Sequence, residues 1–124
     1  MKMNILIVTS TRADFSLLKN LYKKLNASYT TKMLVTGTHL SKAYGYTIKE
    51  IKKSKINIYN TINWKSFSDN EINISRNFSK TLEQITAIFK KDKFDLLILL
   101  GDRYEILAAA ISAHLSRVPI AHLH

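Results

Sequence analysis

Short apolar runs alternate along this chain with longer segments in which apolar residues recur every three or four positions. The clearest runs are residues 5–8 and residues 96–100, and a glycine follows the second. A wholly apolar run of this length is typical of a strand buried on both faces, and the wider spacing is typical of a helix with one apolar face. The alternation predicts an α/β fold, in which a parallel sheet carries helices on both faces.

Five strands and four helices account for the pattern. The strands are expected at residues 4–8, 32–35, 56–62, 94–100 and 119–123. The helices are expected around residues 17–25, 47–53, 74–89 and 106–115, with Asp14 as the cap of the first. The third helix should turn an apolar stripe toward the core, consisting of Ile74, Phe78, Leu82, Ile85 and Phe89.

Length and composition fit one globular domain that spans residues 1–124. Hydrophobic residues make up 46% of the chain and charged residues 23%, and no apolar run reaches the ~18 residues of a bilayer span. The absence of cysteine excludes disulfides, thiolate metal sites and cysteine nucleophiles. Without a signal-peptide pattern at the start, these features fit a cytoplasmic protein.

The net charge of +10 is compatible with an acidic partner, which would be a nucleic acid, a membrane surface or a phosphorylated small molecule. The densest basic cluster, residues 49–55, lies on the polar face of a short predicted helix. It lacks the interleaved aromatic residues of a single-strand binder. We therefore expect no nucleic-acid partner and no membrane partner, and we interpret most lysines as solvated surface.

Polar residues follow the predicted strands where ligands bind in parallel sheets. They form four loops, at residues 10–14, 36–39, 101–105 and 122–124. Because parallel strands end at the same edge, the loops should converge there, and the sequence predicts a ligand site at that edge.

The loop Ser10-Thr11-Arg12 joins a strand to a helix, so backbone N–H groups and the helix dipole favour an anion there. Arg12 would add a fork of donors suited to phosphate. The alternative is that the hydroxyl residues cap the helix and Arg12 is a surface charge, and the spacing leaves both open. Glycine occurs only at positions 37, 45 and 101, so dinucleotide-binding and Walker A motifs are absent.

Gly101 and Asp102 follow the most apolar predicted strand. The glycine allows a tight turn, and Asp102 at the end of the strand is placed to accept a proton or to bind a sugar hydroxyl. The alternative is that Asp102 caps the next helix and pairs with Arg103. The position at the end of the strand favours the functional interpretation.

Three histidines lie in the same loops, at positions 39, 122 and 124. A single histidine at such a place is more often a hydrogen-bonded core residue than part of a site. His122 and His124 alternate along a predicted strand, so their side chains should share one face, and two histidines at its end favour a site. No metal is expected, because a third histidine or a carboxylate at helical ligand spacing is missing.

Three segments together resemble the N-terminal part of the hydrolysing UDP-N-acetylglucosamine 2-epimerases. The first is residues 9–18 (TSTRADFSLL). The second is residues 36–41 (TGTHLS), followed by residues 44–47 (YGYT) and 50–51 (EI). The third is residues 101–110 (GDRYEILAAA), followed by residues 119–124 (PIAHLH). The resemblance implies a Rossmann-like parallel sheet, the N-terminal half of a two-domain fold of the glycosyltransferase-B type. In that family Gly-Gly-Glu usually follows the position of His124. Residues 1–124 are therefore expected to be a truncated form without the C-terminal nucleotide-binding domain.

The implied reaction converts a UDP-N-acetylglucosamine-like nucleotide sugar to N-acetylmannosamine, or to a diacetamido analogue, plus nucleotide diphosphate, as in sialic acid biosynthesis. No cofactor is implied, and the choice between UDP and GDP stays open. The non-hydrolysing relatives carry a lysine five residues after the arginine, where this chain has Leu17. The full-length form is expected to be a homo-oligomer.

The resemblance also implies roles for single residues. Asp102 would act as an acid or base on the sugar. His124 stands where related epimerases often place a catalytic glutamate, and a neutral imidazole can also move protons near pH 7. The substrate-binding residues would be Arg12 at the phosphates and His39 in the sugar pocket, together with Arg103 and His122.

Two other functions are compatible with the same residues. One is a glycosyltransferase of the same architecture, which passes the sugar to an acceptor. The other is a truncated binding domain without catalytic activity. In every case residues 1–124 alone are expected to show no turnover, because half of the cleft would be missing.

Overall fold

A five-stranded sheet forms the centre of the computed structural model, which describes residues 2–124. The strands are β1 (Asn4–Thr9), β2 (Thr30–Val35), β3 (Ile58–Thr61), β4 (Leu96–Leu100) and β5 (Ile120–Leu123). Their order across the sheet is β3-β2-β1-β4-β5, and every neighbouring pair is parallel. The order confirms the predicted α/β fold with a parallel sheet.

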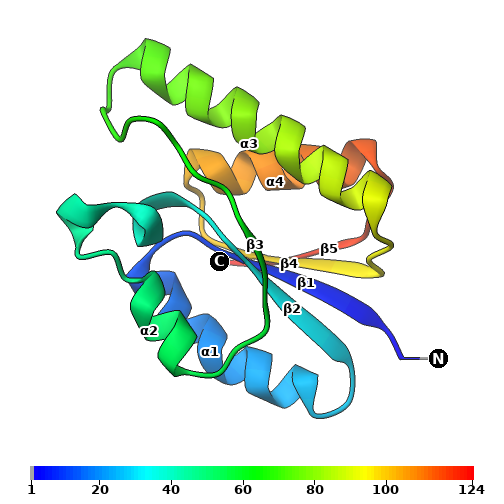
Figure 1. Cartoon of the computed structure of the whole chain (residues 1–124). Coiled ribbons are helices and arrows are strands. Elements are labelled where there is room, and N and C mark those ends of the chain that lie inside the picture. Colours follow the sequence, from blue (N-terminus) through cyan, green and yellow to red (C-terminus); the bar gives the residue numbers. More distant parts are fainter. Residues whose placement is uncertain (1) are drawn as a thin grey trace.

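Helices cover both faces of this sheet (Figure 1). α1 (Arg12–Asn26) and α2 (Ile48–Lys53) lie on one face, and α3 (Glu71–Lys91) and α4 (Tyr104–Leu115) lie on the other. Two short 3-10 helices, η1 (Gly37–Leu40) and η2 (Lys42–Tyr44), lead from β2 to α2. No helix within residues 2–124 is long and apolar enough to cross a membrane.

β1 contributes alternate side chains to two separate cores. Leu6 and Val8 pack in the core on the α3 and α4 side, and Ile5 and Ile7 pack in the core on the α1 and α2 side. All four side chains are at most 1% exposed. This double burial is the physical reason for the continuous apolar run, since neither face of the strand meets water.

The apolar stripe expected along α3 is only partly correct. Ile85 is fully buried, but Leu82 and its neighbours in the stripe are half-buried, and the most buried residues of the helix are Asn77, Thr81, Ile85 and Ile88. Asn77 and Thr81 can be polar because the segment before α3 packs on the helix and supplies hydrogen-bond partners for their side chains. Trp64 Nε1 donates to Thr81 Oγ1 (3.0 Å), and Asn77 Nδ2 donates to a backbone carbonyl of that segment (3.0 Å). Apolar spacing alone does not reveal these buried polar positions.

The start of α1 also differs from the prediction. The cap is Thr11, not Asp14, because the Thr11 hydroxyl accepts from the backbone N–H of Asp14 (3.2 Å). Asp14 is the third helical residue and returns the interaction by accepting from the backbone N–H of Thr11 (2.9 Å). This reciprocal pair is a capping box, which satisfies two N–H groups that the first turn leaves free.

Candidate active site

The loops that leave β1, β2, β4 and β5 meet at one edge of the sheet. Thr38 N donates to the Ser10 carbonyl (2.9 Å), which joins the loops after β1 and β2. Gly101 N donates to the Leu123 carbonyl (3.1 Å), which joins the end of β4 to the end of β5. The predicted convergence of the four loops is confirmed, and the candidate site is built on this edge.

Asp14 occupies the backbone donors in the first loop. Its carboxylate accepts from the N–H groups of Ser10 (3.1 Å) and Thr11 (2.9 Å) and from the hydroxyl groups of Thr9, Ser10 and Thr11. These two N–H groups are therefore not free to hold an external anion. Of the two alternatives for this loop, anion binding and helix capping, the backbone N–H and hydroxyl groups serve helix capping.

Arg12, the first residue of α1, remains open to solvent. Its side chain is 72% exposed and its Nε lies 3.3 Å from Glu50 Oε1 on α2. The two residues line a pocket of about 430 Å³ together with Thr38 and Thr47. Arg12 thus has one carboxylate partner and lines an open pocket, and its guanidinium has further N–H donors that an anion would use.

His39 is enclosed by its own chain in this structure, and its expected place in a sugar pocket stays a prediction. The side chain is 0% exposed. The Thr9 hydroxyl donates its single proton to Asp14, so it accepts from Nε2–H of His39 (2.9 Å), and Nδ1 then accepts from the Thr47 hydroxyl (2.7 Å). Burial lowers the pKa of His39 below 6.5, and the charge of Asp14 offsets part of that effect.

Asp102 follows the end of β4, as predicted, and its side chain is exposed. It does not cap the next helix: the cap position of α4 is Arg103, and no side chain hydrogen-bonds there. Nor does Asp102 take the arginine as its partner, because Arg103 Nε donates to Glu105 Oε2 (3.0 Å). The alternative interpretation of Asp102 as a cap paired with Arg103 is therefore wrong, and its carboxylate is accessible at the edge.

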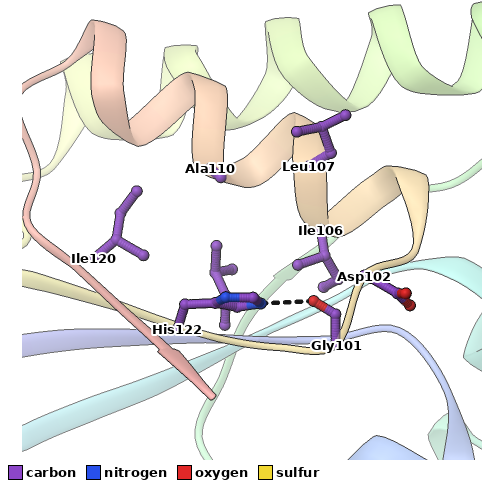
Figure 2. A pocket seen from close by; sticks show the side chains of 8 residues that line it. Gly101, Asp102, Ile106, Leu107, Ala110, Ile120 and His122 are labelled. Atoms are coloured by element: carbon purple, nitrogen blue, oxygen red, sulfur yellow. Dashed lines mark hydrogen bonds between the residues drawn. The ribbon is translucent and has the colours of Figure 1, made fainter. Parts of the chain in front are cut away.

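His122 and Asp102 line one pocket between β5 and α4, with a volume of about 400 Å³ (Figure 2). The other residues of its lining are mostly apolar, including Ile106 and Ile120. Figure 2 shows the His122 ring reaching the Gly101 carbonyl, at 2.7 Å from Nε2. A carbonyl can only accept, so Nε2 carries the proton and Nδ1 is left as an acceptor.

His124 does not continue the alternation expected with His122. β5 ends at Leu123, and the backbone of His124 has left the extended conformation, with a φ of 52°. The argument that placed both rings on one face of a strand therefore does not apply to His124.

A smaller pocket of about 200 Å³ lies next to both of these pockets and shares lining residues with each. It shares Thr11 with the Arg12 pocket and Asp102 with the His122 pocket, and Arg103 and Leu17 also line it. The three pockets form a row along the carboxyl edge, with Asp102 where two of them meet. Within residues 2–124, no three His, Asp or Glu side chains gather in a way that could hold a metal ion.

Two residues that the sequence interpretation missed lie at the centre of this edge. Glu105 is 0% exposed, and Gly37 packs directly against it: a Cβ at Gly37 would lie 2.7 Å from Glu105 Oε2. The signal for Glu105 was present, because it shares a face with Ala108, Ala109 and Ser112 on a mostly apolar helix. A lone carboxylate on that buried face is unusual enough to mark the position.

The sequence is similar to one protein family and to individual proteins of known activity. The model of the family described as UDP-N-acetylglucosamine 2-epimerase matches residues 23–124. The UDP-N,N'-diacetylbacillosamine 2-epimerase (hydrolyzing) of Legionella pneumophila is 36% identical over 97% of this chain and 32% of its own length. The GDP/UDP-N,N'-diacetylbacillosamine 2-epimerase (hydrolyzing) of Campylobacter jejuni is 34% identical over 98% of this chain and 32% of its own.

A solved structure shares the fold. The UDP-GlcNAc 2-epimerase of Neisseria meningitidis, crystallised with UDP-GlcNAc, superposes with a TM-score of 0.80 at 18% identity, over 97% of this chain and 32% of that one. The chain described here thus spans about a third of the length of these relatives.

Proposed function

The chain belongs to the UDP-N-acetylglucosamine 2-epimerase family, and from this premise we propose that the full-length protein is a hydrolysing 2-epimerase. Its substrate would be a UDP-N-acetylglucosamine-like nucleotide sugar. The products would be N-acetylmannosamine, or a diacetamido analogue, and the nucleotide diphosphate. The two relatives described as hydrolyzing, at 36% and 34% identity, support the hydrolysing type.

The observation that carries the proposal is the position of Asp102. Its carboxylate is exposed where two pockets of the carboxyl edge meet, and Arg103 lines one of them. Leu17 is exposed in that same pocket, at the position where the non-hydrolysing relatives are expected to carry a lysine. A free carboxylate next to cationic side chains fits a reaction that moves a proton while an anionic group departs.

The proposed chemistry has two steps. A base removes the proton from C2 of the sugar while the bond between C1 and the diphosphate oxygen breaks, which leaves a double bond between C1 and C2. Water then adds its hydroxyl group to C1, and a proton returns to C2 on the opposite face, so that C2 is inverted. No electrons leave the sugar, so the sequence of steps needs no redox cofactor.

Each proposed role follows from what the side chain can reach. Asp102 moves the C2 proton, because its carboxylate is accessible and makes no hydrogen bond or ion pair with a side chain of residues 2–124. Arg12 and Arg103 neutralise the diphosphate as it leaves. His122 offers Nδ1 as an acceptor to a sugar hydroxyl, since its Nε2 proton is committed to Gly101. His124 remains a second candidate for proton transfer, on the family resemblance alone.

We further propose that residues 1–124 form one half of the cleft of a glycosyltransferase-B type protein. A second Rossmann-like domain of the full-length protein would supply the nucleotide-binding half, consistent with relatives about three times as long. A homo-oligomeric full-length enzyme is part of the same proposal, and so is a cytoplasmic location, which the cysteine-free composition supports.

The test uses the full-length protein with UDP-N-acetylglucosamine and with the UDP- and GDP-linked diacetamido sugars. Release of nucleotide diphosphate is measured together with solvent deuterium at C2 of the free sugar product. We expect release and deuterium incorporation in equal amounts with at least one of these substrates. Asp102→Asn keeps the shape of the side chain but cannot accept a proton, and should lower the rate by ~10²–10⁴-fold.

Three outcomes would contradict the proposal. A 2-epimer that is still linked to nucleotide would indicate the non-hydrolysing reaction. Diphosphate release that depends on an added sugar acceptor, without deuterium at C2, would indicate a glycosyltransferase. Wild-type activity of Asp102→Asn would remove Asp102 from the mechanism.

A further inference from the structure

Glu105 is the most deeply buried charged side chain at the carboxyl edge, and the proposed mechanism does not use it. It lies in the first turn of α4, with an exposed fraction of 0%. Its Oε2 accepts from Arg103 Nε (3.0 Å), whereas Oε1 is buried and has no hydrogen-bond partner among residues 2–124. Arg103 is therefore its one hydrogen-bond partner among these residues, and the N-terminal end of the α4 dipole adds a weaker compensation for the charge.

Burying a carboxylate with one partner is costly for the fold. An ion pair that leaves an oxygen unsatisfied is often less stable than an apolar side chain of similar volume. The helix face around Glu105 is otherwise made of small and apolar residues, so packing alone does not call for a charge there. The free-energy cost of burying Glu105 points to a role in the candidate site, because buried polar groups without partners in native proteins tend to occur at functional sites.

The geometry of the pair suggests that role. Glu105 engages only Nε, so the two terminal nitrogens of the Arg103 guanidinium keep their N–H groups for another partner. The Arg103 side chain is 44% exposed and lines the pocket that connects Thr11 with Asp102. A guanidinium held at Nε presents its end-on fork in a fixed plane, the arrangement that binds phosphate oxygens in pairs.

We propose that Glu105 is a positioning residue. By accepting from Nε it fixes the orientation of the Arg103 guanidinium, so that the two terminal nitrogens are already oriented to bind the diphosphate of the nucleotide sugar. This inference rests on the proposed function for the identity of the anion. It adds a residue that never touches the substrate and acts through Arg103.

Gly37 completes the arrangement. Its φ is 67°, and a Cβ there would lie 2.7 Å from both Glu105 Oε2 and the Ser10 carbonyl oxygen. Glu105 Oε2 is the atom that holds Arg103 Nε. The absence of a side chain at position 37 thus leaves the space in which the pair forms, and the loop after β2 shares in positioning the arginine.

The test is a double-mutant cycle in the full-length protein, with UDP as the probe. Its dissociation constant is measured by calorimetry for the wild type, Glu105→Gln, Arg103→Ala and the double variant. Glu105→Gln keeps the volume but removes the charge that holds the guanidinium. We expect it to weaken UDP binding by about tenfold when Arg103 is present, and by less than about twofold when Arg103 is alanine.

The outcomes separate the two proposals. If Glu105→Gln weakens binding equally with and without Arg103, or leaves it unchanged, the positioning role is overturned while the proposed function stands. If the wild type neither binds UDP nor turns over a nucleotide sugar, the proposed function fails first. Should Glu105→Gln not fold, Glu105→Asp provides the same cycle, because it keeps the charge but retracts the carboxylate from Arg103 Nε.

Discussion

Replacing Gly37 by alanine should destabilise the fold far more than the same change at Gly45. Both residues have positive φ, 67° and 85°, so either alanine adopts a backbone conformation that L-residues avoid. The surroundings differ. A Cβ at Gly45 meets nothing within 4 Å, whereas a Cβ at Gly37 lies 2.7 Å from the Ser10 carbonyl oxygen and 3.0 Å from Ser10 Cβ. Gly45→Ala is therefore a matched control for the backbone effect.

The magnitude follows from these contacts. The left-handed conformation costs an alanine about 1–2 kcal/mol, which is the whole effect expected at Gly45. At Gly37 the Cβ must also displace main-chain atoms of the loop after β1, and overpacking of this kind adds about 1–3 kcal/mol. We expect Gly37→Ala to lower the free energy of unfolding by about 2–5 kcal/mol. That is a large part of the ~5–15 kcal/mol typical of a domain.

Urea unfolding followed by tryptophan fluorescence provides the measurement. Trp64 is the single tryptophan of the chain and is only 8% exposed, so its emission reports loss of the core. With a slope of about 1–3 kcal/mol per molar urea, the expected difference moves the midpoint by roughly 1 M between the two variants. Equal midpoints for Gly37→Ala and Gly45→Ala would refute the close contact with Ser10 and Glu105.

Three further results are expected. Because folding lowers the pKa of His39, the unfolded chain takes up a proton at a higher pH than the folded chain, and the free energy of unfolding should fall as the pH drops through 6.5. His39→Gln should flatten that part of a pH series of unfolding midpoints. Ile85→Ala should cost ~2–5 kcal/mol, with a smaller loss for the half-buried Leu82→Ala; an equal loss in urea titrations would show that the stripe faces the core after all. Arg12→Ala should change stability by less than ~1 kcal/mol, since its pair with Glu50 is exposed, but should weaken UDP binding to the full-length protein; unchanged calorimetric affinity would show that Arg12 is only a surface charge.

The position of the candidate site could be predicted from the sequence, but the state of its residues could not. Asp102 follows an apolar run and a glycine, and the strand-end rule places it at the ligand edge without any tertiary information. His39 follows a strand in the same way, yet its ring is buried and hydrogen-bonded on both sides. Whether a side chain at a strand end points outward or inward depends on which loop packs beside it, and that contact joins segments far apart in the chain.

The same limit applies to helix ends and helix faces. The pattern of α1 shows that a hydroxyl or an acid begins the helix, but Thr11 and Asp14 fill complementary places in one capping box, and only the backbone shows which is the cap. In α3 the buried Asn77 and Thr81 are satisfied by the segment around Trp64, which the helix sequence does not contain.

The sequence by itself determined the strand and helix order, the parallel sheet and the edge where the loops gather, because these follow from local apolar periodicity and from the geometry of parallel strands. The tertiary structure alone decided the pairing of Arg103 with Glu105, the fit of Gly37 against both, and the burial of His39. The fit of Gly37 and the burial of His39 depend on distances of a few ångströms between loops far apart in the chain; Ser10 and Thr38 are 28 residues apart, and Gly37 and Glu105 are 68 apart. Arg103 and Glu105 are close in the sequence, and only the orientation of their side chains in the folded loop decides their pairing. Periodicity carries no information about such distances, because the packing of helices and loops on the whole sheet decides which side chains meet there.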